Sequence, residues 1–319
     1  MDVALDSFDF PDSRLDPQVA HRLRDLSLLV SLPQISLRLI DLIGDPNTSV
    51  RELRDVVEMD PALTAKVISL ANSTYYAVRV PVKTVERAIT IIGYQELGLM
   101  SLGMGLTETF NVSAGPRGFD SESLWIHSLA VSWLGQRLAL QVKTVEPGEA
   151  MIAGLLHELG LIVLVSKFPL IFQKLLDLIL AGQIGLEAES ALMIRHELVG
   201  FELACMWKLP KIYLEAILYH HQPEKAKENK AIVALTSLAD ILANKIGFGL
   251  QTEVLEADPD YILQTIGLSP VDLQAFIRQT ILASKDVLPL WRQMLRATAP
   301  AAAASKSRFS SLKSEAPGP

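Results

Sequence analysis

The sequence predicts an all-α fold built from two packed helical subdomains. Half of its 319 residues are hydrophobic but only 6% are aromatic, and its abundant Leu, Ala and Ile favour helix. Apolar residues recur at helical spacing along most of the chain, and we find no sustained alternation of period two bounded by turn residues. Strands are therefore expected to be absent.

Capping residues mark the first predicted helices. Ser49 and Glu52 form a capping box, which predicts a helix start. Asp60 and Pro61 predict an N-cap with a first-turn proline, and Gly93 predicts the end of a later helix. Further helices are expected over residues 95–110, 121–141, 148–157, 160–166, 169–181, 187–207, 210–220, 229–246, 259–266, 269–284 and 286–297.

Changes in composition predict the domain boundaries. Residues 1–16 are acidic and lack periodicity, which predicts a flexible arm, and the Ala-, Ser- and Pro-rich residues 298–319 predict a disordered tail. A loop with Gly, Pro and Ser at residues 111–120 separates the helical halves. We therefore expect an N-terminal subdomain over residues 17–112, a C-terminal subdomain over residues 120–250, and further C-terminal helices over residues 258–297.

Charge and composition argue against several classes of protein. Lys and Arg number 29 against 36 Asp and Glu, a formal charge of −7, which disfavours direct binding to nucleic-acid phosphates. Residues 1–16 carry five Asp, unlike a signal peptide, and charges interrupt the most apolar region, residues 155–186, which argues against a membrane span. One cysteine, Cys205, excludes an internal disulfide and fits a reducing compartment. We expect a cytoplasmic protein without membrane contact.

Histidines are concentrated in the second half of the chain. Five of the six lie within a hundred residues of one another, whereas His21 stands alone. Each of them taken singly is more often a structural polar residue, and that interpretation stays open. Together, imidazoles and carboxylates at several helix ends are what a divalent transition metal requires. The candidate metal ligands are His127, His157, Glu158, His196, His220, His221 and Asp240.

These residues resemble the ligand motifs of an HD-type phosphohydrolase domain, whose metal ligands follow the order His, His-Asp and Asp. The resemblance implies an HD-phosphohydrolase-like C-terminal subdomain. By this resemblance, His127 in LWIHSLA is the first ligand and His157 in GLLHELG is the paired histidine. Asp240 in SLADILA matches the terminal carboxylate.

The remaining candidates resemble a two-metal version of this domain. His196 in RHELVG and the pair His220 and His221 in YHHQP match histidines that the HD-GYP phosphodiesterases insert before the last Asp. The sequence departs from the pattern at Glu158, which occupies the place of the family's aspartate. Its extra methylene displaces the carboxylate oxygens by about a bond length, whereas metal sites tolerate errors on the order of 0.2 Å.

The first half resembles the HDOD family, the HD-related output domains of bacterial signalling. The likeness spans about residues 28–247 and implies an all-helical, non-catalytic module that passes signals through protein contacts. Such modules are often fused to receiver, GGDEF or EAL domains; none is visible here, and we expect a stand-alone member. The matching positions are Leu32, Pro33, Asp60, Pro61, Leu63, Asn72, Ser73, Ala88, Ile89, Gly93, Trp207 and Pro210.

Two functions follow from these resemblances. The first is a regulatory module that binds signalling proteins and keeps the metal cluster as a vestigial site or as a sensor of a metal or small nucleotide. The second is a metal-dependent phosphohydrolase acting on a nucleotide or cyclic dinucleotide, in which a metal-bound water attacks phosphorus. The metals implied are Fe, Mn or Zn, and the extra methylene of Glu158 favours the regulatory interpretation.

Overall fold

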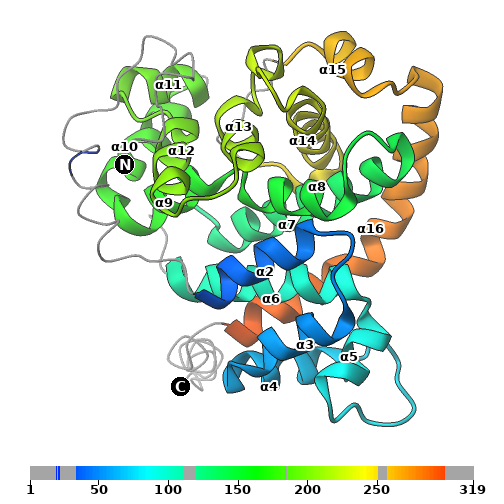
Figure 1. Ribbon diagram of the computed structural model, residues 1–319. Coiled ribbons are helices and arrows are strands. Elements are labelled where there is room, and N and C mark those ends of the chain that lie inside the picture. The colour runs from blue at the N-terminus through cyan, green and yellow to red at the C-terminus, as the bar shows by residue number, and fades with distance from the viewer. Residues whose placement is uncertain are drawn as a thin grey trace, which may run out of the picture.

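The computed structural model describes residues 19, 21, 34–110, 119–183, 185–250 and 257–298. Within these ranges the chain is helical and contains no strand, which confirms the predicted all-α class (Figure 1). The predictions made for residues 1–16, 111–118 and 299–319 lie outside the described residues. The predicted subdomain boundaries therefore stay predictions.

In the described part of the first half, the helices α2 to α6 pack on one another. Ser49 and Glu52 make the expected capping box, and the Asp60 carboxylate accepts from the backbone N–H groups of Ala62 and Leu63. Gly93 adopts a φ of 95°, a conformation that L side chains rarely reach, and ends a helix as expected. The helices are α2 (Gln34–Gly44), α3 (Val50–Glu58), α4 (Pro61–Ala71), α5 (Val85–Ile92) and α6 (Tyr94–Phe110).

The side chain of Asn72 fixes the long connection between α4 and α5. Its Nδ2 donates to the Ile68 carbonyl and to the Val82 carbonyl, both at 2.8 Å. Its Oδ1 accepts from the Val82 N–H at 2.8 Å. Asn72 thus pairs with both backbone groups of Val82 as a neighbouring strand would, which ties the end of the connection to the end of α4.

The second half is a bundle in which α7 and α14 lie at the centre (Figure 1). The helix α7 packs against α8 and α14, while α9 packs against α12. The elements are α7 (Ser121–Val142), α8 (Pro147–Leu156), α9 (Leu159–Lys167), α10 (Pro169–Leu180), α11 (Gly185–Leu192), α12 (His196–Met206), α13 (Lys211–Tyr219), the 3-10 turn η2 (Pro223–Lys225), α14 (Lys230–Ala243) and the π-helical segment η3 (Asn244–Phe248).

The last described helix returns to the first half. After α15 (Pro259–Ile266), the long helix α16 (Pro270–Thr298) contacts α7, then α6 and α4. Figure 1 shows α16 running down one side of the molecule and finishing beside α6. The two halves are therefore joined by direct packing and by this shared C-terminal helix.

Two helix predictions were wrong in their bounds. The helix expected over residues 187–207 is broken between Leu192 and His196, where Met193 has a φ of 52°. The break expected between residues 284 and 286 is absent, and α16 continues through Pro289. Packing explains the continuity, because Trp291 and neighbouring apolar residues of α16 are buried on α6 and α7 and outweigh the local cost of the proline.

Among the residues that the structure describes, two stretches are long and apolar enough to cross a membrane. They are residues 147–167, with a mean hydropathy of 1.7, and residues 230–248, with 1.5. In the most apolar window of each, 94% and 67% of the residues are buried inside the protein. This burial is the usual state of central helices in a helical bundle.

Candidate metal centre

The structure brings all seven predicted site residues into one buried cluster. They come from five places in the second half, and none is more than 4% exposed. The cluster consists of His127 in α7, His157 and Glu158 at the α8–α9 junction, His196 at the start of α12, His220 and His221 after α13, and Asp240 in α14.

A close helix crossing places two of these residues side by side. A Cβ atom added to Gly160 would lie 1.8 Å from the carbonyl oxygen of His196. Only glycine therefore allows α9 to approach α12 this closely. Because Glu158 lies just before α9 and His196 begins α12, the crossing brings Glu158 Oε2 to 3.5 Å from His196 Nε2.

The ligand atoms of the seven predicted residues fall into two groups, and His196 also forms a further group with Glu189 and Glu197. In the first group, His127 Nε2 lies 3.2 Å from His157 Nε2 and 3.3 Å from Asp240 Oδ1. The second group contains Glu158, His196, His220 and His221. The rings of His157 and His220 are 5.1 Å apart, so the groups are neighbours.

His196 is the centre of the second group. Its Nε2 lies 3.4 Å from His220 Nε2 and 3.3 Å from His221 Nε2. The rings of His220 and His221 lie 4.1 Å apart. Three imidazole nitrogens and one carboxylate oxygen of Glu158 thus face a common point.

Backbone carbonyls orient three of the imidazoles. A carbonyl oxygen only accepts, so the ring nitrogen facing it, Nδ1, carries the proton and Nε2 faces the cluster. This arrangement of an outer acceptor on a ligating histidine is common to protein metal sites. The pairs are His127 with Phe248 O at 2.7 Å, His157 with Gly154 O at 2.8 Å, and His220 with Ile217 O at 2.8 Å.

A carboxylate orients the fourth imidazole. Glu189, which is 1% exposed, accepts from His196 Nδ1 at 2.8 Å and from the His196 backbone N–H at 2.9 Å. Glu197 lies 3.6 Å from the same Nδ1 and pairs with Arg195 at 2.5 Å. Neither Glu189 nor Glu197 is among the predicted ligands. In the continuous helix expected there, Glu189 and His196 would be two turns apart, and only the break at Met193 brings them together.

Burial and neighbouring charges shift the pKa values of the histidines in this cluster in opposite directions. Burial lowers the pKa of His157 to about 3 and, together with neighbouring imidazoles, lowers the pKa of His220 well below its ordinary value. Both rings are therefore neutral and present an Nε2 lone pair. Burial also disfavours charge on His196, but Glu189 and Glu158 outweigh it and hold the His196 pKa well above its ordinary value.

The donor atoms fit a divalent transition metal. Two nitrogens each about 2.05 Å from one tetrahedral ion are about 3.3 Å apart, and the Nε2 separations are 3.2–3.4 Å. The neutral His157 and His220 rings direct Nε2 lone pairs at the ring nitrogens that face them, and a cation between the rings would bind these lone pairs. Imidazole and carboxylate together suit Fe, Mn or Zn.

Two further observations fit a divalent metal: buried polar atoms that lack hydrogen bonds, and an excess of buried negative charge. Asp240 Oδ2 and His221 Nδ1 are buried without a hydrogen-bond partner in the described part of the chain. Four buried carboxylates surround the histidines, and only two positive groups offset them: the guanidinium of Arg195 beside Glu197 and the ring of His196 beside Glu189. Buried negative charge is costly without a compensating cation, so a divalent ion would stabilise the cluster.

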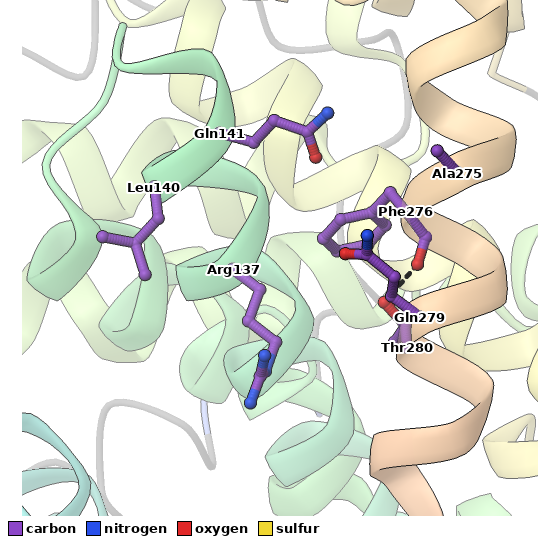
Figure 2. Close-up of a pocket in the computed structure, with 7 residues that line it drawn as sticks. All are labelled: Arg137, Leu140, Gln141, Ala275, Phe276, Gln279 and Thr280. Carbon is purple, nitrogen blue, oxygen red and sulfur yellow. Dashed lines mark hydrogen bonds between the residues drawn. The ribbon is translucent and has the colours of Figure 1, made fainter.

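A surface groove lies well away from this cluster. It has a volume of about 460 Å³ and lies between α7 and α16, lined by Arg137, Leu140 and Gln141 of α7 and by Phe276 and Gln279 of α16 (Figure 2). The groove residues of α7 come ten or more residues after His127, which is about 15 Å along the helix axis. The groove therefore does not open onto the metal ligands.

Comparison with solved structures places the fold among signalling and HD-related proteins. An HDOD domain protein with unknown function from Geobacter sulfurreducens is 26% identical, with 88% of this chain and 99% of that chain covered and a TM-score of 0.69. A proposed signal transduction protein from Marinobacter aquaeolei VT8 is 25% identical, with 90% and 63% covered and a TM-score of 0.73. A proposed phosphohydrolase from Shewanella amazonensis SB2B, 20% identical with 88% and 98% covered, shares the fold at a TM-score of 0.63.

Sequence comparison defines the family. An uncharacterized protein of Treponema pallidum (strain Nichols) is 22% identical over 236 residues, which are 72% of this chain but 44% of the relative. The chain thus spans less than half of that relative and 63% of the Marinobacter chain. The family model of the HDOD domain matches residues 29–223, more than half of the 319 residues. The chain belongs to the HDOD domain family.

Proposed function

We propose that this protein is a bacterial, cytoplasmic signalling module that acts by binding partner proteins, and that its buried cluster holds a divalent metal as a sensor rather than for turnover. Membership of the HDOD family and the likeness to a proposed signal transduction protein support the signalling role. The formal charge of −7 supports protein partners over direct nucleic-acid binding.

The burial of the ligands is the observation that carries the sensing role. All seven ligand side chains are between 0% and 4% exposed. A phosphodiester must bring its phosphorus to a metal-bound water, and ligands this deeply enclosed favour an ion held inside the bundle. An enclosed ion still acts on the protein, because any ligand that binds only the folded state stabilises it.

The protein's own residues would hold and orient the ion. His157 and His220 present neutral Nε2 atoms, fixed by bonds from Nδ1 to backbone carbonyls. Glu189 fixes the ring of His196 in the same way. The bound metal would supply positive charge to the buried carboxylates, which ties the packing of α12 and α14 to metal occupancy.

Elemental analysis combined with partner capture tests this proposal. We expect the purified full chain to carry Fe, Mn or Zn in stoichiometric amount, and the double variant His157→Ala, His220→Ala to lose it. We also expect the parent protein to retain a specific protein partner that the double variant binds at least about tenfold more weakly. Metal-free parent protein, or equal partner binding by both proteins, would contradict the proposal.

The completeness of the ligand set favours a second candidate function, a metal-dependent phosphohydrolase. The first group contributes three protein ligands, His127, His157 and Asp240, and three-ligand sites leave a coordination position for water, whose pKa a metal lowers. Asp240 would help to hold the ion. Turnover of a nucleotide or cyclic dinucleotide by metal-loaded protein, lost in Asp240→Asn, would support this function, and absence of turnover with every tested metal would exclude it.

A further inference from the structure

We infer that the two ligand groups are different kinds of metal site: the second retains its ion permanently, and the first exchanges its ion and reports its occupancy to α16. This inference rests on the proposed metal-binding function and specifies which residues do the sensing. It is carried by the number of ligands in each group and by what holds each group in place.

The second group is a closed site and the first is an open one. Glu158, His196, His220 and His221 give the second group four protein ligands, the number found in structural sites. The carboxylate of Glu158 lies with this group and not with the first. The first group has three ligands, the number at which one position stays open. A site with one ligand fewer is expected to bind its ion more weakly.

The residues that hydrogen-bond to the ligands of the two groups differ in how firmly they are held. His196 is held by Glu189, which is 1% exposed and bonded to both the ring and the backbone of His196. In the first group, two of the three ligands are held by η3 instead. The Phe248 carbonyl accepts from His127 Nδ1 at 2.7 Å, and Asn244 Nδ2 donates to Asp240 Oδ1 at 2.9 Å.

The segment η3 is suited to move with its ligands. It is a single π-helical turn with no buried residue, and its Gly247 has a φ of 97° outside helical values. Elements with few buried contacts open most readily. Loading of the first group pulls on His127 and Asp240 together, and therefore on both ends of η3.

Aromatic contacts connect η3 to the C-terminal helix. The ring of Phe248 lies 5.8 Å from that of Trp291 in α16, and Trp291 lies 6.0 Å from Trp133 in α7. Because Trp291 is 2% exposed, a shift of Phe248 changes a buried indole environment. We therefore expect the emission of Trp291 to report on the first group.

A zinc titration of the metal-free full chain tests the inference. We expect two binding phases whose affinities differ by at least tenfold. The emission of Trp291, taken as the difference between the parent and Trp291→Phe, should change only in the weaker phase. Trp291→Phe should still bind two zinc ions, because Trp291 is not one of the candidate ligands.

Two shape-conserving variants separate the sites. Asp240→Asn should keep the tight phase and lose the weak phase together with the emission change. His221→Gln should weaken the tight phase and keep the emission change. Equal affinities, loss of both phases in Asp240→Asn, or an emission change in the tight phase would overturn the inference while leaving metal binding intact. A parent protein that binds no zinc would overturn the proposed function as well.

Discussion

The two halves of this protein bury very different chemistry. In the described part of α2–α6, the buried polar side chains are the hydroxyls of Ser36, Ser73 and Ser101. In α7–α14, five histidines and four carboxylates of one cluster are buried, together with the separate carboxylate of Glu215. Every buried ionisable side chain among the described residues lies between positions 127 and 240.

This difference in buried side chains indicates that the two halves are stabilised in different ways. The first half is held by apolar packing and helix caps, which need no ion. The second half buries four carboxylates, which outnumber the charged groups of His196 and Arg195 that pair with them. Excess buried charge destabilises a fold unless a further cation compensates it. A pure scaffold would gain stability by replacing these groups with apolar residues. On the proposed function, the second half should respond to metal while the first half does not.

The largest effect is expected from Gly160→Ala. The added Cβ would meet the His196 carbonyl at 1.8 Å, so α9 and α12 must separate, at a cost of about 3 kcal/mol or more. Metal content and thermal unfolding should both fall. Gly103→Ala in α6 is the matched control, because its nearest atoms lie at 3.7 Å. An unchanged metal content in Gly160→Ala would contradict the proposed geometry.

The second-largest effect is expected from metal removal, which should destabilise the second half but not the first. A ligand at a hundred times its Kd stabilises a fold by about 2.7 kcal/mol, so a chelator should lower the stability by about that amount. Hydrogen exchange, followed by mass spectrometry, should increase in α12, α14 and η3 and stay unchanged in α3 and α4. A uniform increase over both halves would show that the metal does not act on the second half specifically.

A smaller effect is expected from Glu189→Gln. The amide keeps the size of the side chain but removes the charge that orients His196, and loss of such an outer partner costs about 10–100-fold in metal affinity. Competition with a chromophoric chelator measures the affinity. Glu187→Gln is the control, since Glu187 lies exposed on the same helix. Equal metal affinities of Glu189→Gln and Glu187→Gln would show that Glu189 does not support metal binding through His196.

The smallest effect belongs to the first half. Asn72→Ala removes the bonds to Ile68 and Val82 and should cost about 1.5 kcal/mol of unfolding free energy. Denaturant unfolding measures this loss. Metal content should not change, because Asn72 lies in the half without ligands. Loss of metal from this variant would mean that the two halves do not behave separately.

Local signals in the sequence were enough to predict the helices and to identify the candidate ligands. The capping box at Ser49 and the Asp60–Pro61 pair act within one turn, so composition and spacing are enough to find them. The histidine motifs nominated seven residues, and the structure brings their side chains together. Their role as metal ligands stays a proposal.

Features that depend on packing were not predictable in the same way. The break at Met193, which places Glu189 on His196, has no sequence pattern of its own. The continuity of α16 through Pro289 depends on buried contacts with distant helices. The division of the ligands into a four-residue and a three-residue group depends on where the Glu158 carboxylate points, which spacing cannot specify.

Anomalous diffraction from crystals of the protein as purified tests the central claim most directly. We predict a peak for a transition metal within about 2.0–2.3 Å of His196 Nε2 and of its neighbours in the second group. Density without such a peak, with water alone between the imidazoles, would contradict the account.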